Sequence, residues 1–393
     1  MKAVMKPKVK SLRSRINALI AISIFSAVSC APQDQSGEPN SRTIPTESVG
    51  IVSISPRGVE SIDEIDNSMV FAFDSNGEIV GRSEGQSIHS LQASISGRSA
   101  VVPFGDRVSI LTENSSNEFP IERESIVQSV ANAPSSGAVT IWFNSGISNG
   151  RYVNRFASVS ADGSLKTGSV PGMVFSSVYC GDRNFALVRE SYIGSTGNPE
   201  DNYLYELDGS GFPTVRAEWK YPSYFSSITP TGACTSDGKK FVSLYIWEDA
   251  ISSDGSGDLT LVQIDTETGV RSERPLDMSG HTWVTERSSL SIIGDRLYWI
   301  TGDGEVMSSA LEGSSGVERK WIIPEWHDRV RVSVEGDKVS FLDFGNSPFY
   351  AEFDLISGNQ TLDAIELPWL NEIAGSDTLS GKTQYTVSDV DNI

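Results

Sequence analysis

Histidine and cysteine are scarce in this chain, with only three of each among its 393 residues. The histidines, His89, His281 and His327, form no His-x-x-x-His pair and no paired-carboxylate motif reinforces them, so the sequence predicts no metal site. The Gly-x-Ser-x-Gly elbow, the phosphate-binding glycine loop and the His-Glu-x-x-His motif are missing as well. No catalytic residue and no cofactor is therefore assigned, and the sequence favours a binding protein over an enzyme.

A long apolar run is missing too. The apolar stretch near the amino terminus, residues 16–29, has 14 residues, whereas a helix that spans a bilayer needs about 20. Six basic residues and no acidic one precede this stretch, and residues 27–30 are Ala-Val-Ser-Cys. This order of basic, apolar and small residues before a cysteine is typical of a secretory signal, and it resembles the lipobox of bacterial lipoproteins.

The resemblance implies that residues 1–29 are a lipoprotein signal peptide and that Cys30 becomes an acylated first residue, carrying palmitate-type chains. It also implies a location at the cell membrane, anchored by lipid and facing outside the cytoplasm. The alternatives are an ordinary signal peptide with an incidental cysteine, or an uncleaved anchor. Residues 30–65 are then the lipidated cysteine followed by a flexible tether and lead-in, because residues 31–48 are rich in Ser, Pro, Gly, Gln, Asn and Thr and cannot bury a core.

Positive charge is in short supply. The chain has 31 Lys and Arg against 51 Asp and Glu, a formal net charge of −20, and loss of residues 1–29 would make it more negative. A surface this acidic repels nucleic acid and anionic lipid headgroups. We therefore expect no nucleic-acid partner, and contact with the membrane through the amino-terminal lipid only.

What the sequence does contain, from about residue 66 onward, is strand after strand joined by tight turns. Short runs rich in Val, Ile, Tyr, Phe and Trp alternate with turns of Gly, Asp and Ser. One hairpin recurs, in which an aromatic-rich strand leads into an acidic or Asn residue and then a Gly. Its copies are residues 69–77, 155–163, 203–211, 260–269, 306–316 and 349–358, with a degenerate copy at 114–117. A second turn marker, Gly-Asp or Asp-Gly, precedes another strand in most periods.

Two hairpins in each period mean four strands in each period. Units of four strands at 40–50 residues resemble the blades of a β-propeller, and seven copies imply seven blades. We thus expect an all-β fold over residues 66–393, a seven-bladed β-propeller of four-stranded blades closed by strands from both termini. The first blade should take two strands from each terminus, although residues 50–55 could instead add a strand there.

The alignment of the repeats also predicts a disulfide. Cys180 and Cys234 occupy matching places just before the second strand of consecutive blades, four and five. Equivalent positions of neighbouring blades lie close together in a propeller, as a disulfide requires, and a pair of cysteines in an exported protein favours a bridge. Two buried free thiols are the alternative.

Candidate ligand-binding residues fall between the last strand of one blade and the first strand of the next. In propellers these segments open onto one face, where exposed aromatic side chains suit recognition of a protein or a sugar. Packing between blades is the competing explanation for such aromatics, and it applies to Trp369 as well. The residues that we assign to this face are Tyr221, Tyr224, Phe225, His281, Trp283, Trp326 and His327.

These observations predict a lipid-anchored binding or scaffold protein outside the cytoplasm, which recognises a protein or glycan of the cell envelope through loops on one propeller face. One alternative is a hydrolase or lyase acting on carbohydrate, with carboxylates drawn from Glu286, Glu325 and Asp328 at the same face. Another is an envelope assembly-factor lipoprotein that pairs a strand edge with its client. The fold alone does not decide among them.

Overall fold

The computed structural model describes most of the chain beyond residue 42, and all of the described residues belong to one compact unit, Pro39–Ile393. Residues 1–29 and Cys30, on which the expected lipid anchor depends, lie outside the described residues. No helix among the described residues is long and apolar enough to cross a membrane. The described ranges are 43–56, 67–190, 200–207, 212–221, 225–227, 231–247, 259–282, 289–313, 316–374 and 385–393.

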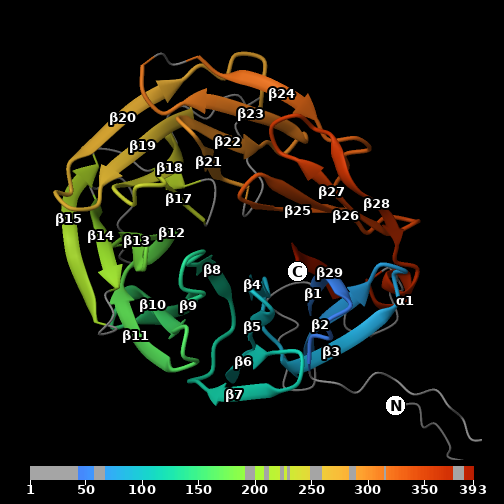
Figure 1. Ribbon diagram of the computed structural model, residues 1–393. Helices are drawn as coiled ribbons and strands as arrows, with labels where there is room; N and C mark the ends of the chain where they lie inside the picture. Colours follow the sequence, from blue (N-terminus) through green and yellow to red (C-terminus); the bar gives the residue numbers. More distant parts are fainter. Residues whose placement is uncertain are drawn as a thin grey trace, which may run out of the picture. The chain divides into compact units, whose positions relative to one another are not determined.

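Seven antiparallel sheets follow one another around a ring (Figure 1). In each sheet the strands lie side by side from the axis of the ring to its rim, and each pairs with its neighbour. The predicted all-β, seven-bladed propeller with four-stranded blades is confirmed. We number the blades from the one that contains the first strand of the chain. Blade 2 consists of β4 (Ser94–Ser96), β5 (Ser99–Pro103), β6 (Arg107–Leu111) and β7 (Ser116–Pro120). Blade 3 consists of β8 (Val127–Asn132), β9 (Val139–Ser148), β10 (Arg151–Val159) and β11 (Leu165–Pro171).

The remaining blades repeat this plan, and in blade 5 two short strands share the innermost position by pairing with the same second strand. Blade 4 consists of β12 (Met173–Cys180), β13 (Arg183–Arg189), β14 (Glu200–Leu207) and β15 (Pro213–Tyr221). Blade 5 consists of β16 (Phe225–Ser227), β17 (Ala233–Cys234), β18 (Lys240–Trp247), β19 (Leu259–Asp265) and β20 (Arg271–Leu276). Blade 6 consists of β21 (Ser291–Ile293), β22 (Arg296–Ile300), β23 (Glu305–Ala310) and β24 (Glu318–Ile322). Blade 7 consists of β25 (Val330–Glu335), β26 (Lys338–Asp343), β27 (Phe349–Asp354) and β28 (Gln360–Glu366), and the short helix α1 (Trp369–Ala374) follows it.

Blade 1 closes the ring with strands from both ends of the chain, as predicted, but not in the predicted proportion. The strand order is β29-β1-β2-β3, so one strand comes from the carboxyl-terminal end and three come from the amino-terminal end. The expectation of two strands from each end was wrong, and the alternative that residues 50–55 add a strand is confirmed, since β1 lies inside the segment 30–65 that we had assigned to the tether and lead-in. This strand is rich in Val and Ile and almost wholly buried, as a central strand must be. The four strands are β29 (Tyr385–Asn392), β1 (Ser48–Pro56), β2 (Asn67–Asp74) and β3 (Ile79–Gln86).

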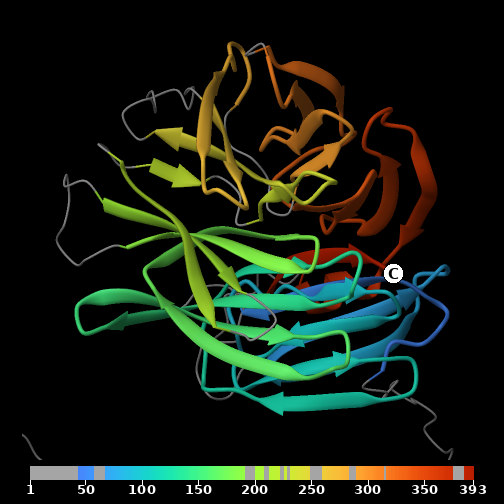
Figure 2. The ribbon, with the colours of Figure 1, turned by 60° about the vertical axis from the view of Figure 1, so that its left-hand side comes forward.

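The first strand of each blade faces the axis of the ring, and we call these the inner strands. Neighbouring inner strands contact one another around the ring, as β8 does with β12 and β25 with β29. The fourth strands lie at the rim, and the blades twist between the axis and the rim (Figure 2). Apolar side chains fill the space between successive blades: Phe73 of blade 1 meets Tyr350 of blade 7 with ring centroids 5.2 Å apart, and both are fully buried.

The recurring hairpin of the sequence is the turn from the third to the fourth strand in every blade. In blade 5, Asp265 Oδ1 accepts hydrogen bonds from the backbone N–H groups of Thr268 and Glu267, at 2.7 and 3.1 Å. Gly269 ends the turn with a φ of +72°, and a Cβ there would lie 2.8 Å from the carbonyl oxygen of Arg216 in blade 4. The Asp of this repeat therefore closes the turn through hydrogen bonds, and the Gly allows the turn to pack closely against the preceding blade.

The predicted disulfide is present between Cys180 and Cys234, whose Cα atoms are 5.4 Å apart. It joins the ends of the inner strands β12 and β17, which belong to blades 4 and 5. The same two blades are also linked by a backbone hydrogen bond of 2.9 Å from Gly232 N–H to the Ser177 carbonyl. The covalent bond therefore reinforces two inner strands where they already meet.

Candidate functional site

The segments between the fourth strand of one blade and the inner strand of the next open at one end of the ring, which we call the loop face. Of the residues assigned to this face from sequence, Tyr224 and Trp283 lie outside the described residues, as does the candidate carboxylate Glu286. Tyr221 ends β15 and Phe225 begins β16, but their side chains are not among those described. His281, Trp326 and His327 are described with their contacts.

His281 and His327 each contact an acidic side chain of the blade whose inner strand follows them. His281 Nδ1 lies 2.7 Å from Glu305 Oε2 at the start of β23, and Arg319 Nη1 lies 2.8 Å from the other oxygen of Glu305. Burial by itself would raise the pKa of Glu305, but the hydrogen bonds from Arg319 and His281 lower it below the ordinary value. The carboxylate is thus kept charged to hold its two partners.

His327 uses both ring nitrogens. Nδ1 accepts a hydrogen bond of 3.1 Å from the backbone N–H of Arg329, so Nε2 carries the proton that faces Asp343 Oδ2 at 3.0 Å. His89, in the blade 2 segment, joins that segment to the next through its backbone N–H and carbonyl, which bond to Ser125 and Val127. Among the described residues no group of three or more His, Cys, Asp and Glu is placed to hold a metal ion.

Trp326 is fixed by its neighbours and also faces solvent. Its Nε1–H donates to the Gly302 carbonyl at 2.7 Å, and its ring lies on Gly304, where a Cβ would approach it to 2.6 Å. Together with His327 it lines a pocket of about 310 Å³, the loop-face pocket, between blades 6 and 7. The other residues that line this pocket are Gly302, Asp303, Asp328, Val330 and Arg331.

Two other tryptophans repeat this way of closing a turn. Trp321 Nε1–H donates to the Leu355 carbonyl at 2.8 Å and its ring lies against Gly358, so blade 6 closes a turn of blade 7. Trp369, in α1, donates to the Gly77 carbonyl of blade 1 at 2.9 Å. The indoles of Trp321 and Trp369 pack between blades, which is the structural role that we gave as the alternative to ligand binding. Trp326 packs in a similar way and also lines the loop-face pocket.

A second cavity, which the sequence did not point to, lies on the axis of the ring. Its volume is about 260 Å³, and all seven blades contribute to it from their inner strands or the residues beside them. We call it the channel cavity. Its lining includes residues 92–94, 130–132, 177–179, 231–234, 290–292, 333–336, 389 and 391. Most of these positions lie near the turns from the first to the second strand, so the channel cavity is at the end of the inner strands away from the loop face.

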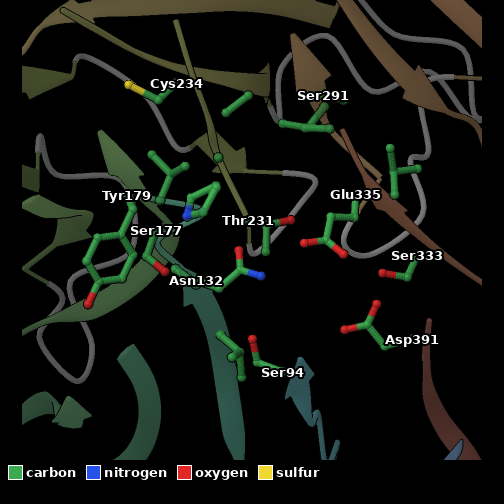
Figure 3. Close-up of a pocket in the computed structure, with 18 of the residues that line it drawn as sticks. Ser94, Asn132, Ser177, Tyr179, Thr231, Cys234, Ser291, Ser333, Glu335 and Asp391 are labelled. Carbon is green, nitrogen blue, oxygen red and sulfur yellow. The ribbon is translucent and has the colours of Figure 1, made fainter. Parts of the chain in front are cut away.

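The channel cavity is acidic. Glu335, Asp389 and Asp391 are the charged residues of its lining, which includes no Lys, Arg or His. Figure 3 shows the carboxylates of Glu335 and Asp391 directed into the same space as the side-chain amide of Asn132. Burial, and after it the charges of Asp389 and Glu335, raise the pKa of Asp391 well above its ordinary value. The residue Glu335 is exposed overall, but partial desolvation of its carboxylate raises the pKa, against the lowering effect of the nearby Lys338 charge.

The comparisons with known proteins show similarity in architecture only. No family model matches the sequence, and no curated protein matches it. BamB from Moraxella catarrhalis is 13% identical, with 69% of this chain and 71% of that chain covered and a TM-score of 0.39. Apo AztD from Citrobacter koseri is 12% identical, with 88% and 98% covered and a TM-score of 0.41. A putative 6-phosphogluconolactonase from Bacteroides uniformis is 11% identical, with 88% and 100% covered and a TM-score of 0.48. Sequence identities and TM-scores as low as these support no inference about the function of this chain.

Proposed function

We infer that this chain is a lipid-anchored scaffold outside the cytoplasm that captures a protein or glycan of the cell envelope at its loop face. The loop-face pocket is the observation that carries this proposal. Its volume of about 310 Å³ lies within the range of ordinary ligand sites. The lipid anchor is supported by the sequence of residues 1–30.

The chemistry of the loop-face pocket suits recognition. Trp326 offers a broad apolar surface that its hydrogen bond to Gly302 and its contact with Gly304 hold in place. Asp303 and Asp328 bring carboxylate oxygens, which accept hydrogen bonds from hydroxyl or amide groups. A flat aromatic surface beside fixed acceptors is the combination that sugars and polar peptide segments need, and little ordering is required when the ligand arrives.

Binding is favoured over hydrolysis by the exposure of the nearby acids. A glycosidase pairs two carboxyl groups, one of which is buried enough to stay protonated as the general acid. Glu325 and Asp328, the described candidates at this face, are both exposed to solvent. The two acids among the described residues that line the pocket, Asp303 and Asp328, are both exposed, and the lining has the side chains that a binding site uses.

The proposal is tested by crosslinked capture from the native envelope with the full-length lipidated chain. Trp326→Ala and Asp328→Asn should lose the captured protein, or the bound glycan on a glycan array. Trp321→Ala is the matched control, since that indole closes a neighbouring turn in the same way but does not line the loop-face pocket. Equal capture by the parent chain and all three variants would exclude the loop face. Cys30→Ser should move the protein to the soluble fraction, and its retention in membranes would contradict the lipid anchor.

A further inference from the structure

A third cavity, which we call the rim pocket, lies between blades 2 and 3. It shares no lining residue with the loop-face pocket or with the channel cavity. Its volume of about 400 Å³ lies within the range of ordinary ligand sites. Blade 2 contributes the end of β7 and the segment that follows it, and blade 3 contributes residues of β9, β10 and β11.

The pairing of strands arranges the blade 3 wall of the rim pocket. Arg155 on β10 lies directly opposite Phe143 on β9 and Ser169 on β11, and residues directly opposite in a sheet present their side chains on the same face. Ala157 and Thr167 form the next row on that face. Phe143 and Ala157 are each only 1% exposed, so the wall has an apolar inner part, an outer part with hydroxyl groups, and a guanidinium beside both.

The guanidinium of Arg155 is shared between two carboxylates that differ in exposure. Its Nη1 lies 3.2 Å from Glu124 Oε1, and its Nη2 lies 2.9 Å from Glu122 Oε1. The side chain of Glu124 is 3% exposed, and its other oxygen accepts a hydrogen bond of 2.9 Å from Ser145. The side chain of Glu122 is 72% exposed. Glu124 is therefore a fixed partner of Arg155, whereas Glu122 is a replaceable one, because exposed ion pairs are weak.

The two acids also repel each other. Burial raises the pKa of Glu124 above its ordinary value, hydrogen bonds from Ser145 and Arg155 oppose this rise, and the charge of Glu122 adds to it. The contact between Glu122 and Arg155 thus comes at a cost to the buried acid beside it. A group that replaced Glu122 with better hydrogen-bond geometry would meet little resistance from the protein.

The donors of the rim pocket suit a carboxylate in that place. A guanidinium has five N–H groups, of which the contacts with Glu122 and Glu124 use two. A carboxylate accepts two parallel hydrogen bonds from one guanidinium, and the exposed Ser169 presents a hydroxyl donor beside it. The single negative charge of a carboxylate equals that of the Glu122 side chain, whereas a phosphate dianion would add to the repulsion with Glu124.

We propose that the rim pocket binds a carboxylate that carries an apolar group, and that this carboxylate displaces Glu122 from Arg155. The apolar group packs against Ile121 of blade 2 and against Phe143 and Ala157 of blade 3. Glu122 is then an internal competitor for the guanidinium. The ligand can be a free acid or the apolar carboxyl-terminal residue of a protein, since both present the same chemistry. This inference does not rest on the proposed function, whose pocket lies between blades 6 and 7.

Calorimetry of the full-length chain with three matched probes tests the inference. 3-Phenylpropionate has both groups, 3-phenylpropanol has a hydroxyl in place of the carboxylate, and acetate has the carboxylate without the ring. Phenylpropionate should bind, and each of the other two should bind at least about tenfold more weakly, because each lacks one of the two contacts. Absence of phenylpropionate binding, or equal binding by phenylpropanol, would overturn the inference.

Removal of the internal competitor is the sharpest test. Glu122→Gln should bind phenylpropionate about two- to fivefold more tightly, because no exposed ion pair has to be broken. Glu267→Gln is the matched control: Glu267 is 66% exposed and lies 2.7 Å from Arg183, and it does not line the rim pocket. This control should leave the affinity unchanged. Affinity that Glu122→Gln raises no more than Glu267→Gln does would contradict the displacement.

Two further variants locate the carboxylate. Arg155→Gln should abolish phenylpropionate binding, and Ser169→Ala should weaken it about threefold, the loss of one hydrogen bond. Arg155→Gln leaves the buried Glu124 without its cation, so a thermal melt has to establish that this variant folds. Glu122→Gln and Ser169→Ala change exposed residues and keep the inference testable if it does not. Full binding by a folded Arg155→Gln variant would overturn the inference.

Competition distinguishes the two sources of the carboxylate. A short peptide that ends in phenylalanine is compared with the same peptide ending in a carboxamide. Displacement of phenylpropionate by the free carboxylate alone would support the inference and identify the end of a protein chain as the ligand. Phenylpropionate binding that neither peptide displaces would also support it and identify a free acid. Equal displacement by both peptides would show that the carboxylate is not recognised. Loss of envelope capture by the Trp326 variant bears on the loop face alone.

Discussion

At the scale of the residue, Asp391 carries its charge at a cost to stability. Burial raises the pKa of Asp391 well above the ordinary 3.8, and the negative charges of Asp389, on the same strand, and of Glu335, on β25, raise it further. Two further described groups act on this cluster: Lys338 lowers the pKa of Glu335, and the charge of Asp391 contributes to the raised pKa of Tyr350. Because the native state holds this proton more tightly than the unfolded chain, stability should fall as pH rises from about 3.8 toward the native pKa.

Asp391→Asn should therefore stabilise the protein at neutral pH. Each unit by which the native pKa exceeds the unfolded one corresponds to about 1.4 kcal/mol. The gain should shrink in acid, where the parent side chain is protonated in both states. Urea unfolding of the parent and the variant across this pH range measures the difference, with Asp363→Asn as the control for loss of an exposed charge. A gain that is the same at every pH, or none at all, would contradict the raised pKa.

The same residue shows why the channel cavity could not be found from sequence. Residues 388–392, Ser-Asp-Val-Asp-Asn, are recognisable as a strand with acids at alternate positions, and this pattern is usually a solvated face. Whether that face meets solvent or the axis depends on the place of the strand in the ring, which pairing with β1 decides. By contrast, the loop position of Trp326 could be predicted, but its hydrogen bond to Gly302 could not, because indole contacts depend on the neighbouring blade.

At the scale of the element, the Cys180–Cys234 disulfide should contribute measurably to stability. It closes a segment of 54 residues, and bridges over such lengths restrict the unfolded chain by about 2–4 kcal/mol. A reducing agent should lower the free energy of unfolding by this amount, and the Cys180→Ser/Cys234→Ser double variant should match the reduced parent and no longer respond to reductant. If a thiol titration of the unreduced, unfolded parent found two free thiols, the bridge between Cys180 and Cys234 and its contribution to stability would be contradicted.

The turns between strands were the most predictable elements, because their chemistry is local. Asp265 and Gly269 in blade 5, like Asp354 and Gly358 in blade 7, place a carboxylate acceptor before a glycine of positive φ. An Asp followed by Gly a few residues later is enough to identify such a turn, whatever packs around it. The pairing of the cysteines was predictable for a related reason, since a repeat places equivalent positions of neighbouring blades together.

At the scale of the whole molecule, closure of the ring was predicted only in part. Blade 1 joins segments more than 300 residues apart: Asn392 pairs with Gly50, and Ile393 N–H donates to the Val49 carbonyl at 3.1 Å. Either end of the chain could in principle have supplied the second strand, since both carry strand-forming residues. The choice depends on which strand is buried on both faces, and β1 meets that condition, because Ile51 and Val52, whose side chains point to opposite faces, are at most 1% exposed.

Removal of β29 should therefore open the ring. Val387 and Val390 are at most 1% exposed, and each contributes about 1.5–3 kcal/mol on burial, so together they approach the lower end of the 5–15 kcal/mol that stabilises a domain. A chain ending at residue 384 should lose its cooperative thermal transition. A synthetic peptide of residues 385–393 should restore it, because the strand adds to the exposed edge of β1 through backbone hydrogen bonds and these valines. The same peptide with Val387→Asp and Val390→Asp should not restore it. Cooperative melting of the shortened chain without any peptide would show that the three amino-terminal strands of blade 1 close the ring by themselves.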